Sequence, residues 1–278
     1  MRAAQMDDFD SPSSLRMPVA VLLGLMIPPL GVLAWIGLSG SERRDYLQSP
    51  CRHSPRQKLR HHGVYDADVR SLPDDLRRRL AEPLPGLAAQ LRMAPDPRTW
   101  PEEGTVLRPA AALLLIYPHA GEWHVPLTVR GSGLRHHTGQ VSLPGGRLDH
   151  PDESVEQAAL REAQEEIGVV PTIVEIIGRL TPVPIAVSGH LLHPVVGVTN
   201  ERPAFSVAAP EVDRLIECPV ARLMEPDAVG SEQRVRPVPP HVIQTVPYFD
   251  VAGARIWGAT AMVLAEFIAL LNGVERCR

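Results

Sequence analysis

The sequence predicts an α/β protein with a mixed β-sheet and helices on both faces of that sheet. Residues 110–117 form a short, wholly apolar run, which is typical of a strand buried on both sides. Residues 154–167 place apolar side chains at helical spacing, directly after a strand-like run and a glycine loop at 143–146. A second apolar helix is expected over residues 259–271, with further strand candidates between the two helices.

The N-terminal part of the chain has a different composition. Residues 1–16 contain several aspartates and serines and are expected to be a disordered leader. Residues 17–41 carry no charged side chain over 25 positions, which is long enough for a membrane-spanning helix. Between residues 42 and 60, six basic residues stand against two acidic ones, so the positive-inside rule predicts a single span that anchors a cytoplasmic domain. Two alternatives stay open: an upstream region translated from a wrongly chosen start, and a cleaved or soluble apolar segment.

The remaining elements are expected in chain order. Residues 42–107 are predicted to be a basic linker with a helix near 72–93 that is interrupted around 83–85, and the compact domain is predicted over 108–278. Within the domain, residues 123–130 are expected to pair with 110–117 through a turn at 119–121. Further strands are expected over 140–143, 173–187 (one or two strands), 191–198 and 248–257, with 212–224 as a short helix or strand.

The helix at 154–167 ends in a cluster of acids. Glu162 and Glu166 stand four residues apart on one face, and Glu165 lies beside them. Like charges at this spacing cost a few tenths of a kcal/mol per pair, so the cluster needs a counter-charge. Mg²⁺ is a natural one, because it takes carboxylate oxygens and shares its other positions with water and phosphate. Arg161 precedes Glu165 by four residues and is expected to pair with it.

These residues resemble the Nudix box, a pattern of spaced glycine, glutamate and arginine residues. The matching positions are Gly146, Glu153, Arg161, Glu162, Glu165, Glu166 and Gly168, with six residues instead of the usual five between Gly146 and Glu153. The preceding residues are similar to the signature of the coenzyme A diphosphatase branch of Nudix hydrolases. That similarity rests on the spacing of Arg130, Arg135, Gly139, Leu143, Pro144, Gly145 and Gly146.

The resemblance implies a fold, a reaction and a set of roles. The fold is a Nudix-type α/β/α sandwich with a mixed sheet. The reaction is metal-dependent hydrolysis of the diphosphate bond of coenzyme A or its derivatives, giving 4′-phosphopantetheine and adenosine 3′,5′-bisphosphate. Glu162 and Glu166 are expected to hold Mg²⁺ or Mn²⁺, and Glu165, Arg161 and Glu211 are expected to be catalytic. The residues expected to bind substrate are Arg130, Arg135, Gly139, Gly145 and Gly146.

Other functions are weighed against this one. The formal net charge of −4 gives no sign of nucleic-acid binding through a basic surface, so the expected partner is a small molecule. Another nucleoside diphosphate derivative, such as ADP-ribose or a reduced nicotinamide dinucleotide, is the main alternative substrate. A non-catalytic, membrane-tethered Nudix module that binds a nucleotide is a third interpretation. The intact acid cluster argues against it, because a binding module does not need three acids around a metal. The oligomeric state stays open.

Overall fold

The sheet is organised around strand β1 (Arg108–His119), which the computed structural model places between a parallel and an antiparallel neighbour. It pairs in parallel with β7 and antiparallel with β2 and β4, so the predicted mixed sheet is confirmed. The main path of this 8-stranded sheet is β3-β2-β1-β7-β5, with β4, β6 and β8 attached beside it. The other strands are β2 (Glu122–Arg130), β3 (Val141–Ser142), β4 (Gly145–Arg147), β5 (Glu175–Arg179), β6 (Val183–Ile185), β7 (His190–Val198) and β8 (Val212–Pro219).

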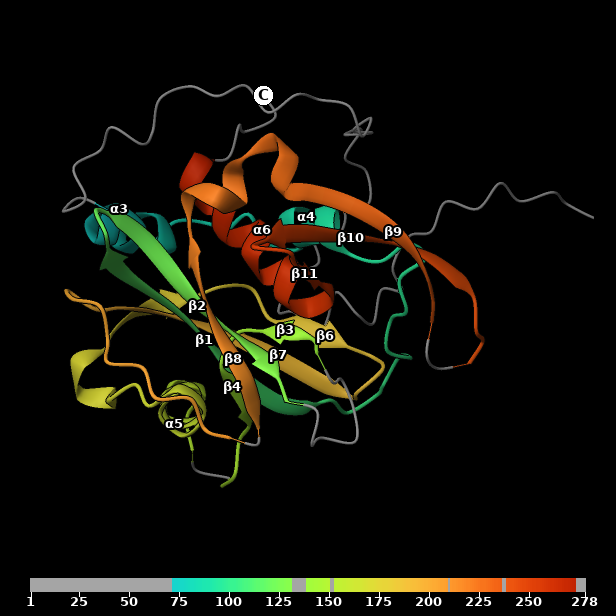
Figure 1. The fold of residues 1–278 in the computed structure, drawn as a ribbon. Coiled ribbons are helices and arrows are strands. Elements are labelled where there is room, and N and C mark those ends of the chain that lie inside the picture. Colours follow the sequence, from blue (N-terminus) through green and yellow to red (C-terminus); the bar gives the residue numbers. More distant parts are fainter. Residues whose placement is uncertain (1–71, 132–138, 151–152, 210, 237–238, 274–278) are drawn as a thin grey trace, which may run out of the picture.

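The two long helices cover opposite faces of this sheet (Figure 1). Successive side chains of a strand point to opposite faces, and β1 is apolar on both. Leu113 and Leu115 pack with small alanines of α5 (Val155–Ile167), whereas Leu114 and Ile116 belong to the core beneath α6 (Gly258–Asn272). The wholly apolar run at 110–117 is therefore buried on both sides, as the sequence predicts.

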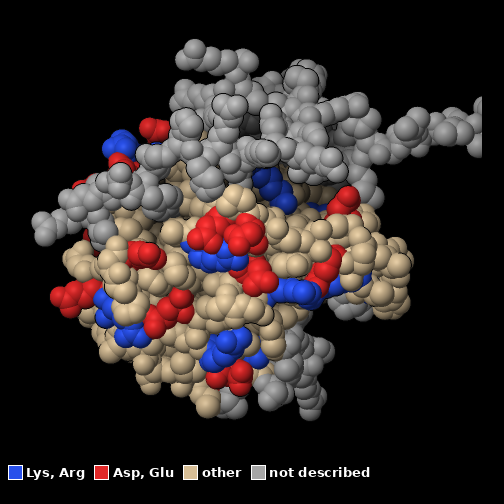
Figure 2. Space-filling view, turned by 45° about the horizontal axis from the view of Figure 1, so that its top comes forward, with Lys and Arg blue, Asp and Glu red and all other residues tan. Residues whose placement is uncertain are grey.

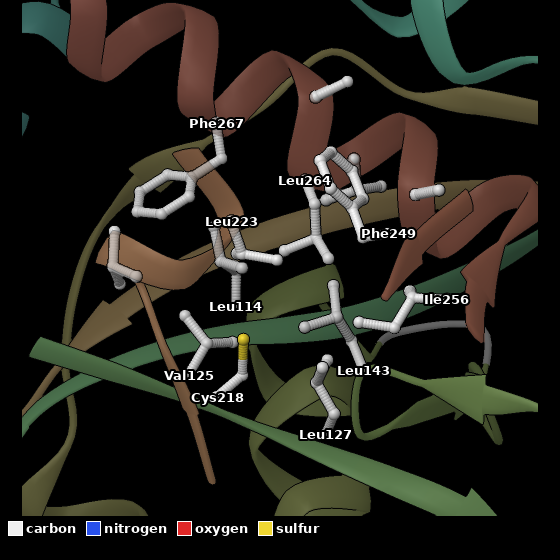
Figure 3. Close-up of a cluster of buried hydrophobic side chains, with 14 of the residues drawn as sticks. Leu114, Val125, Leu127, Leu143, Cys218, Leu223, Phe249, Ile256, Leu264 and Phe267 are labelled. Carbon is white, nitrogen blue, oxygen red and sulfur yellow. The ribbon is translucent and has the colours of Figure 1, made fainter. Parts of the chain in front are cut away.

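The larger core lies between the sheet and α6 (Figure 3). Leu114 and Leu127 from the sheet belong to the same cluster as Leu264 and Phe267 from the helix, and all four are fully buried. The helix is apolar around most of its circumference because a second, three-stranded sheet packs near it. The last expected helix is therefore a core helix.

The second sheet corrects one prediction. Its order is β11-β10-β9, formed by β9 (Val229–Val235), β10 (Ile243–Val251) and β11 (Ala254–Trp257). The single strand expected over 248–257 is wrong, because Ala252 and Gly253 adopt positive φ angles of 51° and 75° and reverse the chain. No strand is predicted at β9, since its four consecutive polar residues, 231–234, resemble a loop.

Residues 72–93 pack on the domain. The predicted helix consists of α3 (Leu72–Leu80), α4 (Gly86–Gln90) and a 3-10 turn (Leu91–Met93), and its interruption falls near 83–85 as predicted. Leu76 is fully buried in the core shared with α6. The buried carboxylate of Glu266 on α6 accepts hydrogen bonds from Gly86 N at 3.0 Å and Gln90 Nε2 at 2.8 Å. The packed unit thus extends well before residue 108, where the sequence analysis placed the start of the compact domain.

The structure describes residues 72–131, 139–150, 153–209, 211–236 and 239–273. The leader at 1–16, the candidate span at 17–41 and the start of the linker lie outside these ranges. Within them, no helix is both long enough and apolar enough to cross a membrane. The N-terminal anchor stays a prediction, which fractionation of cells expressing the full chain would check.

Acidic and basic side chains lie next to one another on the face shown in Figure 2. Many of the surface arginines are ion-paired, for example Arg222 with Asp227 at 2.7 Å. Exposed pairs of this kind contribute little to stability. They do leave this face without a continuous basic surface.

Candidate active site

Helix α5 carries the acid cluster, and its two ends are fixed by local sequence. Ser154 caps the N-terminus: its hydroxyl accepts from Gln157 N at 3.2 Å, and Gln157 Oε1 accepts from Ser154 N at 2.8 Å. This reciprocal pair is a capping box, which the spacing of Ser and Gln in the sequence also indicates. At the other end Gly168 adopts a left-handed conformation with φ of 73°. Such a cap ends the helix directly after the acids.

Arg161 joins the carboxylates at the centre of the site. Its guanidinium donates to Glu165 at 3.2 Å, as predicted, and also to Glu162 at 2.9 Å and to Glu153 at 2.9 Å. Its third nitrogen donates to the carbonyl of Arg147 at 2.9 Å, which ties the helix to the end of β4. Hydrogen bonding to Glu153 raises the pKa of Arg161, so it stays a cation. Arg161 therefore positions the carboxylates.

Glu153 is held firmly despite the extra residue in the loop before it. Its side chain is 10% exposed, and it accepts from Asp149 N at 2.8 Å as well as from Arg161. The hydrogen bond from Arg161 lowers the pKa of Glu153. The additional residue between Gly146 and Glu153 is accommodated in the connecting loop, and Glu153 reaches the site from there.

Glu162 lies directly against the glycine strand. A side chain at Gly146 would bring its Cβ to 2.3 Å from Glu162 Oε1, so only glycine fits while Glu162 keeps this position. Gly145 is also enclosed, but by backbone: its Cβ would lie 2.3 Å from the Ala111 carbonyl oxygen of β1. The two glycines thus let a carboxylate approach from one side and a strand from the other.

Glu166 is half-buried beside Glu162. Burial, reinforced by the negative charge of Glu162, raises the pKa of Glu166 to about 7. The Gly145 N–H donates to this carboxylate, and the charge of Arg130 opposes the shift. The second oxygen, Oε2, is buried and has no hydrogen-bond partner. Buried polar atoms are almost always satisfied, so an orphaned carboxylate oxygen indicates a missing ligand.

The donor set fits a hard divalent cation held with the help of substrate. In the described part of the chain, no three His, Cys, Asp or Glu side chains gather as a complete metal site. Glu162 does lie close enough for its charge to raise the pKa of Glu166, and Glu166 has one carboxylate oxygen without a partner. Mg²⁺ commonly takes only one or two carboxylates and completes its shell with water and phosphate oxygens. Two carboxylates therefore suffice.

The two candidate bases differ in their surroundings. The side chain of Glu165 is 56% exposed and is paired with Arg161. Glu211 is exposed just before β8, with its carbonyl accepting from Gly131 N at 2.9 Å, and its charge raises the pKa of Glu166. It forms no ion pair with any residue that the structure describes. The fold therefore brings Glu211 to the site from a distant part of the sequence.

The remaining predicted binding residues are only partly brought together. Arg130 ends β2, and its Nε is buried without a partner. Gly139 has a φ of 73° and donates from its N to the Arg130 carbonyl at 3.0 Å, so it closes the β2–β3 connection. Arg135 lies outside the described residues, and its role stays a prediction.

A pocket of about 250 Å³ opens next to the glycine strand, between the sheet and the start of α6. Arg130, Gly145 and Gly146 line the end beside the carboxylates. Arg147, Ser188 and His190 line it farther along, and the sequence analysis missed all three. The position of Arg147 after the glycine pair is a local signal that could have identified it. His190 reaches the pocket only because β7 pairs with β1.

Comparisons with known proteins identify the family. Residues 106–244 match the model of the NUDIX domain family. The uncharacterized Nudix hydrolase NudL of Escherichia coli O7:K1 is 38% identical over 149 residues, which cover 54% of this chain and 75% of that protein. NudL of Shigella boydii serotype 18 is 37% identical over the same coverage.

Solved structures were matched as well. A Nudix hydrolase from M. smegmatis, RenU, is 24% identical with a TM-score of 0.33, covering 42% of this chain and 73% of that one. A MutT/nudix family protein from Enterococcus faecalis is 17% identical with a TM-score of 0.39, covering 76% of this chain and 77% of that one. On the family match and the NudL relatives, the chain belongs to the Nudix family, as a hydrolase that acts on pyrophosphate bonds.

Proposed function

We propose that the protein hydrolyses the diphosphate bond of coenzyme A or a derivative of it, using Mg²⁺ or Mn²⁺ held by Glu162 and Glu166. The observation that best supports a metal site is the buried Oε2 of Glu166, which lies beside Glu162 and has no hydrogen-bond partner. The spacing of Arg130, Gly139, Gly145 and Gly146, which resembles the coenzyme A diphosphatase signature, supports the choice of substrate.

The side chains of the site have distinct tasks in this reaction. A diphosphate repels a nucleophile until its charge is neutralised, and a divalent cation supplies that neutralisation and activates water. Arg161 holds Glu162 and Glu165 in place through its hydrogen bonds to both. Arg130 lines the pocket beside Glu166 and is placed to bind a phosphate oxygen, for which its guanidinium geometry is suited. A carboxylate near Glu166 accepts the proton of the attacking water.

Glu211 is the stronger candidate for this base. Glu165 is already engaged by Arg161, whereas Glu211 is close to Glu166 and has no such cation. We expect Glu211→Gln to lower kcat by about 10²- to 10³-fold with little change in KM, since general bases contribute on this scale. Glu165→Gln, the matched variant, is expected to lower kcat less than about tenfold. Steady-state kinetics of both variants check this, and the reverse order would assign the base to Glu165.

Metal affinity is expected to depend on pH in a defined window. The pKa of Glu166 is raised to about 7, so protons compete with a cation for this carboxylate below that pH. Affinity for Mn²⁺ should rise about tenfold per pH unit up to about pH 7 and then level off. Calorimetric titration with Mn²⁺ between pH 5.5 and 8.5, with buffer ionisation corrected, measures this. A flat affinity below pH 7 would contradict the role of Glu166.

The substrate assignment is tested with one panel. The full chain is assayed with Mg²⁺ or Mn²⁺ against coenzyme A, ADP-ribose and reduced nicotinamide dinucleotide at equal concentrations. The highest kcat/KM on coenzyme A, with 4′-phosphopantetheine as product, supports the proposal. A higher value on another compound would make the protein a Nudix hydrolase of that substrate. Tight binding without turnover in the presence of Mn²⁺ would favour the non-catalytic module.

A further inference from the structure

Beyond the two glycines, a second group of polar and cationic side chains lines the pocket: Arg147, Ser188 and His190. Arg108 lies next to this group, because its Nη2 donates to the Ser188 carbonyl at 3.3 Å. None of the residues that line the pocket in the described structure is acidic. This part of the wall thus carries positive charge without a carboxylate to balance it.

His190 on β7 is the register partner of Arg108 on β1. Its Nδ1 is 3.0 Å from Ser188 Oγ, while Nε2 is buried and has no partner. Burial, followed by the charges of Arg108 and Arg147, lowers the pKa of His190, so the ring is neutral at pH 7. Neither arginine forms an ion pair with a described residue. Two unpaired guanidiniums and an orphaned ring nitrogen at one place indicate a polar, anionic ligand.

The N-terminus of α6 adds to the positive electrostatic potential in the pocket. Ala259 and Thr260, in its first turn, line the pocket, and the N-cap residue Trp257 makes no side-chain hydrogen bond to that turn. Uncapped N–H groups and the helix dipole favour negative charge nearby. Apolar side chains such as Leu143 and Leu192 also line the pocket. Its described lining therefore combines cationic and apolar side chains and contains no acidic one.

We propose that Arg147, together with His190 and Arg108, binds a second phosphate group carried on the ribose of the substrate, while Arg130 faces the diphosphate. This inference rests on the proposed function and makes it more specific. Coenzyme A carries a 3′-phosphate on its ribose, whereas ADP-ribose does not. A volume of about 250 Å³ lies below the usual range for a whole ligand, so the pocket takes one arm of the substrate. This second cationic group selects the nucleotide arm with its extra phosphate.

The test compares two nucleotides that differ only in this phosphate. Adenosine 3′,5′-bisphosphate and adenosine 5′-monophosphate are titrated calorimetrically into the full chain. The bisphosphate is expected to bind about 10- to 100-fold more tightly, the scale of charge-assisted hydrogen bonds. In Arg147→Met the ratio should fall below about threefold. Arg222→Ala removes an arginine that is ion-paired elsewhere on the surface and should leave the ratio unchanged.

The outcomes separate this inference from the proposed function. Equal affinities in the unmodified protein, no measurable binding of the bisphosphate, or an unchanged ratio in Arg147→Met would each overturn the second phosphate site. Hydrolysis of coenzyme A is measured separately. If coenzyme A is not hydrolysed but the bisphosphate preference holds and depends on Arg147, the site stands and the proposed substrate fails. If coenzyme A and 3′-dephospho-coenzyme A are hydrolysed with equal kcat/KM, the proposed reaction stands and the second phosphate site fails.

Discussion

Replacing Glu166 with glutamine is expected to lower kcat/KM by at least about 10³-fold and, at the same time, to stabilise the metal-free protein. The loss of activity follows if Glu166 is a cation ligand, because removing the charge leaves the diphosphate oxygens unneutralised. The gain in stability follows from its surroundings. Its carboxylate is half-buried beside Glu162 and has an oxygen without a partner. A neutral amide removes that penalty.

The sign of the stability effect can be worked out from the pKa. Burial raises the pKa of Glu166 to about 7 from an ordinary value near 4.5, so the folded state binds the proton more tightly than the unfolded state. The penalty is therefore absent below about pH 4.5 and complete above about pH 7. It corresponds to roughly 1–3 kcal/mol after allowance for partial exposure.

Thermal unfolding in EDTA checks this prediction. At pH 8 the melting temperature of Glu166→Gln should exceed that of the unmodified protein by about 2–8 °C, and the difference should vanish near pH 4.5. Glu156→Gln is the matched control on the same helix. Its carboxylate is paired with Arg179 and its pKa is lowered, so that variant should lose stability at pH 8. Unchanged activity in Glu166→Gln would remove the proposed cation site.

The second large effect is expected from Gly146→Ala. The new Cβ would lie 2.3 Å from Glu162 Oε1, so the carboxylate must move. The φ angle of Gly146 lies outside the left-handed region, so alanine adds no backbone strain. Because the clash is with the end of a flexible side chain, the fold should survive. Displacing a positioned group by about 1 Å costs on the order of 10²-fold in rate, which is the expected loss of kcat/KM.

Gly145→Ala provides the contrast. Here the Cβ would lie 2.3 Å from the Ala111 oxygen and 2.6 Å from the Ala112 Cα, which are backbone atoms of β1. The strand pairing must open, so we expect a destabilisation of about 3 kcal/mol or more together with loss of activity. Chemical denaturation and kinetics on both variants separate the two effects. If Gly146→Ala unfolds as readily as Gly145→Ala, the glycine serves the fold and not Glu162.

The local features of the site could be predicted from the sequence. The capping box at Ser154 and the pairing of Arg161 with Glu165 depend only on helical spacing, which a sequence displays directly. The burial of 110–117 on both faces follows equally from its composition. These features involve residues within one element, so no knowledge of the packing is needed.

The features that depend on packing could not be predicted. The raised pKa of Glu166 comes from burial that no local pattern reveals. His190 meets Arg147 only because β1 pairs with both β7 and β4. The hairpin of β10 and β11 is different, because its Ala252-Gly253 turn repeats the Ala120-Gly121 turn that the sequence does predict, and the single strand expected over 248–257 overlooks it.

The carboxylate of Glu266 has a practical consequence for where this domain can be cut. The family match begins at residue 106, but two of the donors that satisfy Glu266, Gly86 N and Gln90 Nε2, lie upstream of that point. A fragment trimmed to the family boundary would lose these donors and uncover the side of α6 against which Leu76 and Met93 pack, at roughly 1.5–3 kcal/mol for each large apolar side chain removed. The smallest autonomous folding unit therefore begins before the boundary that homology draws.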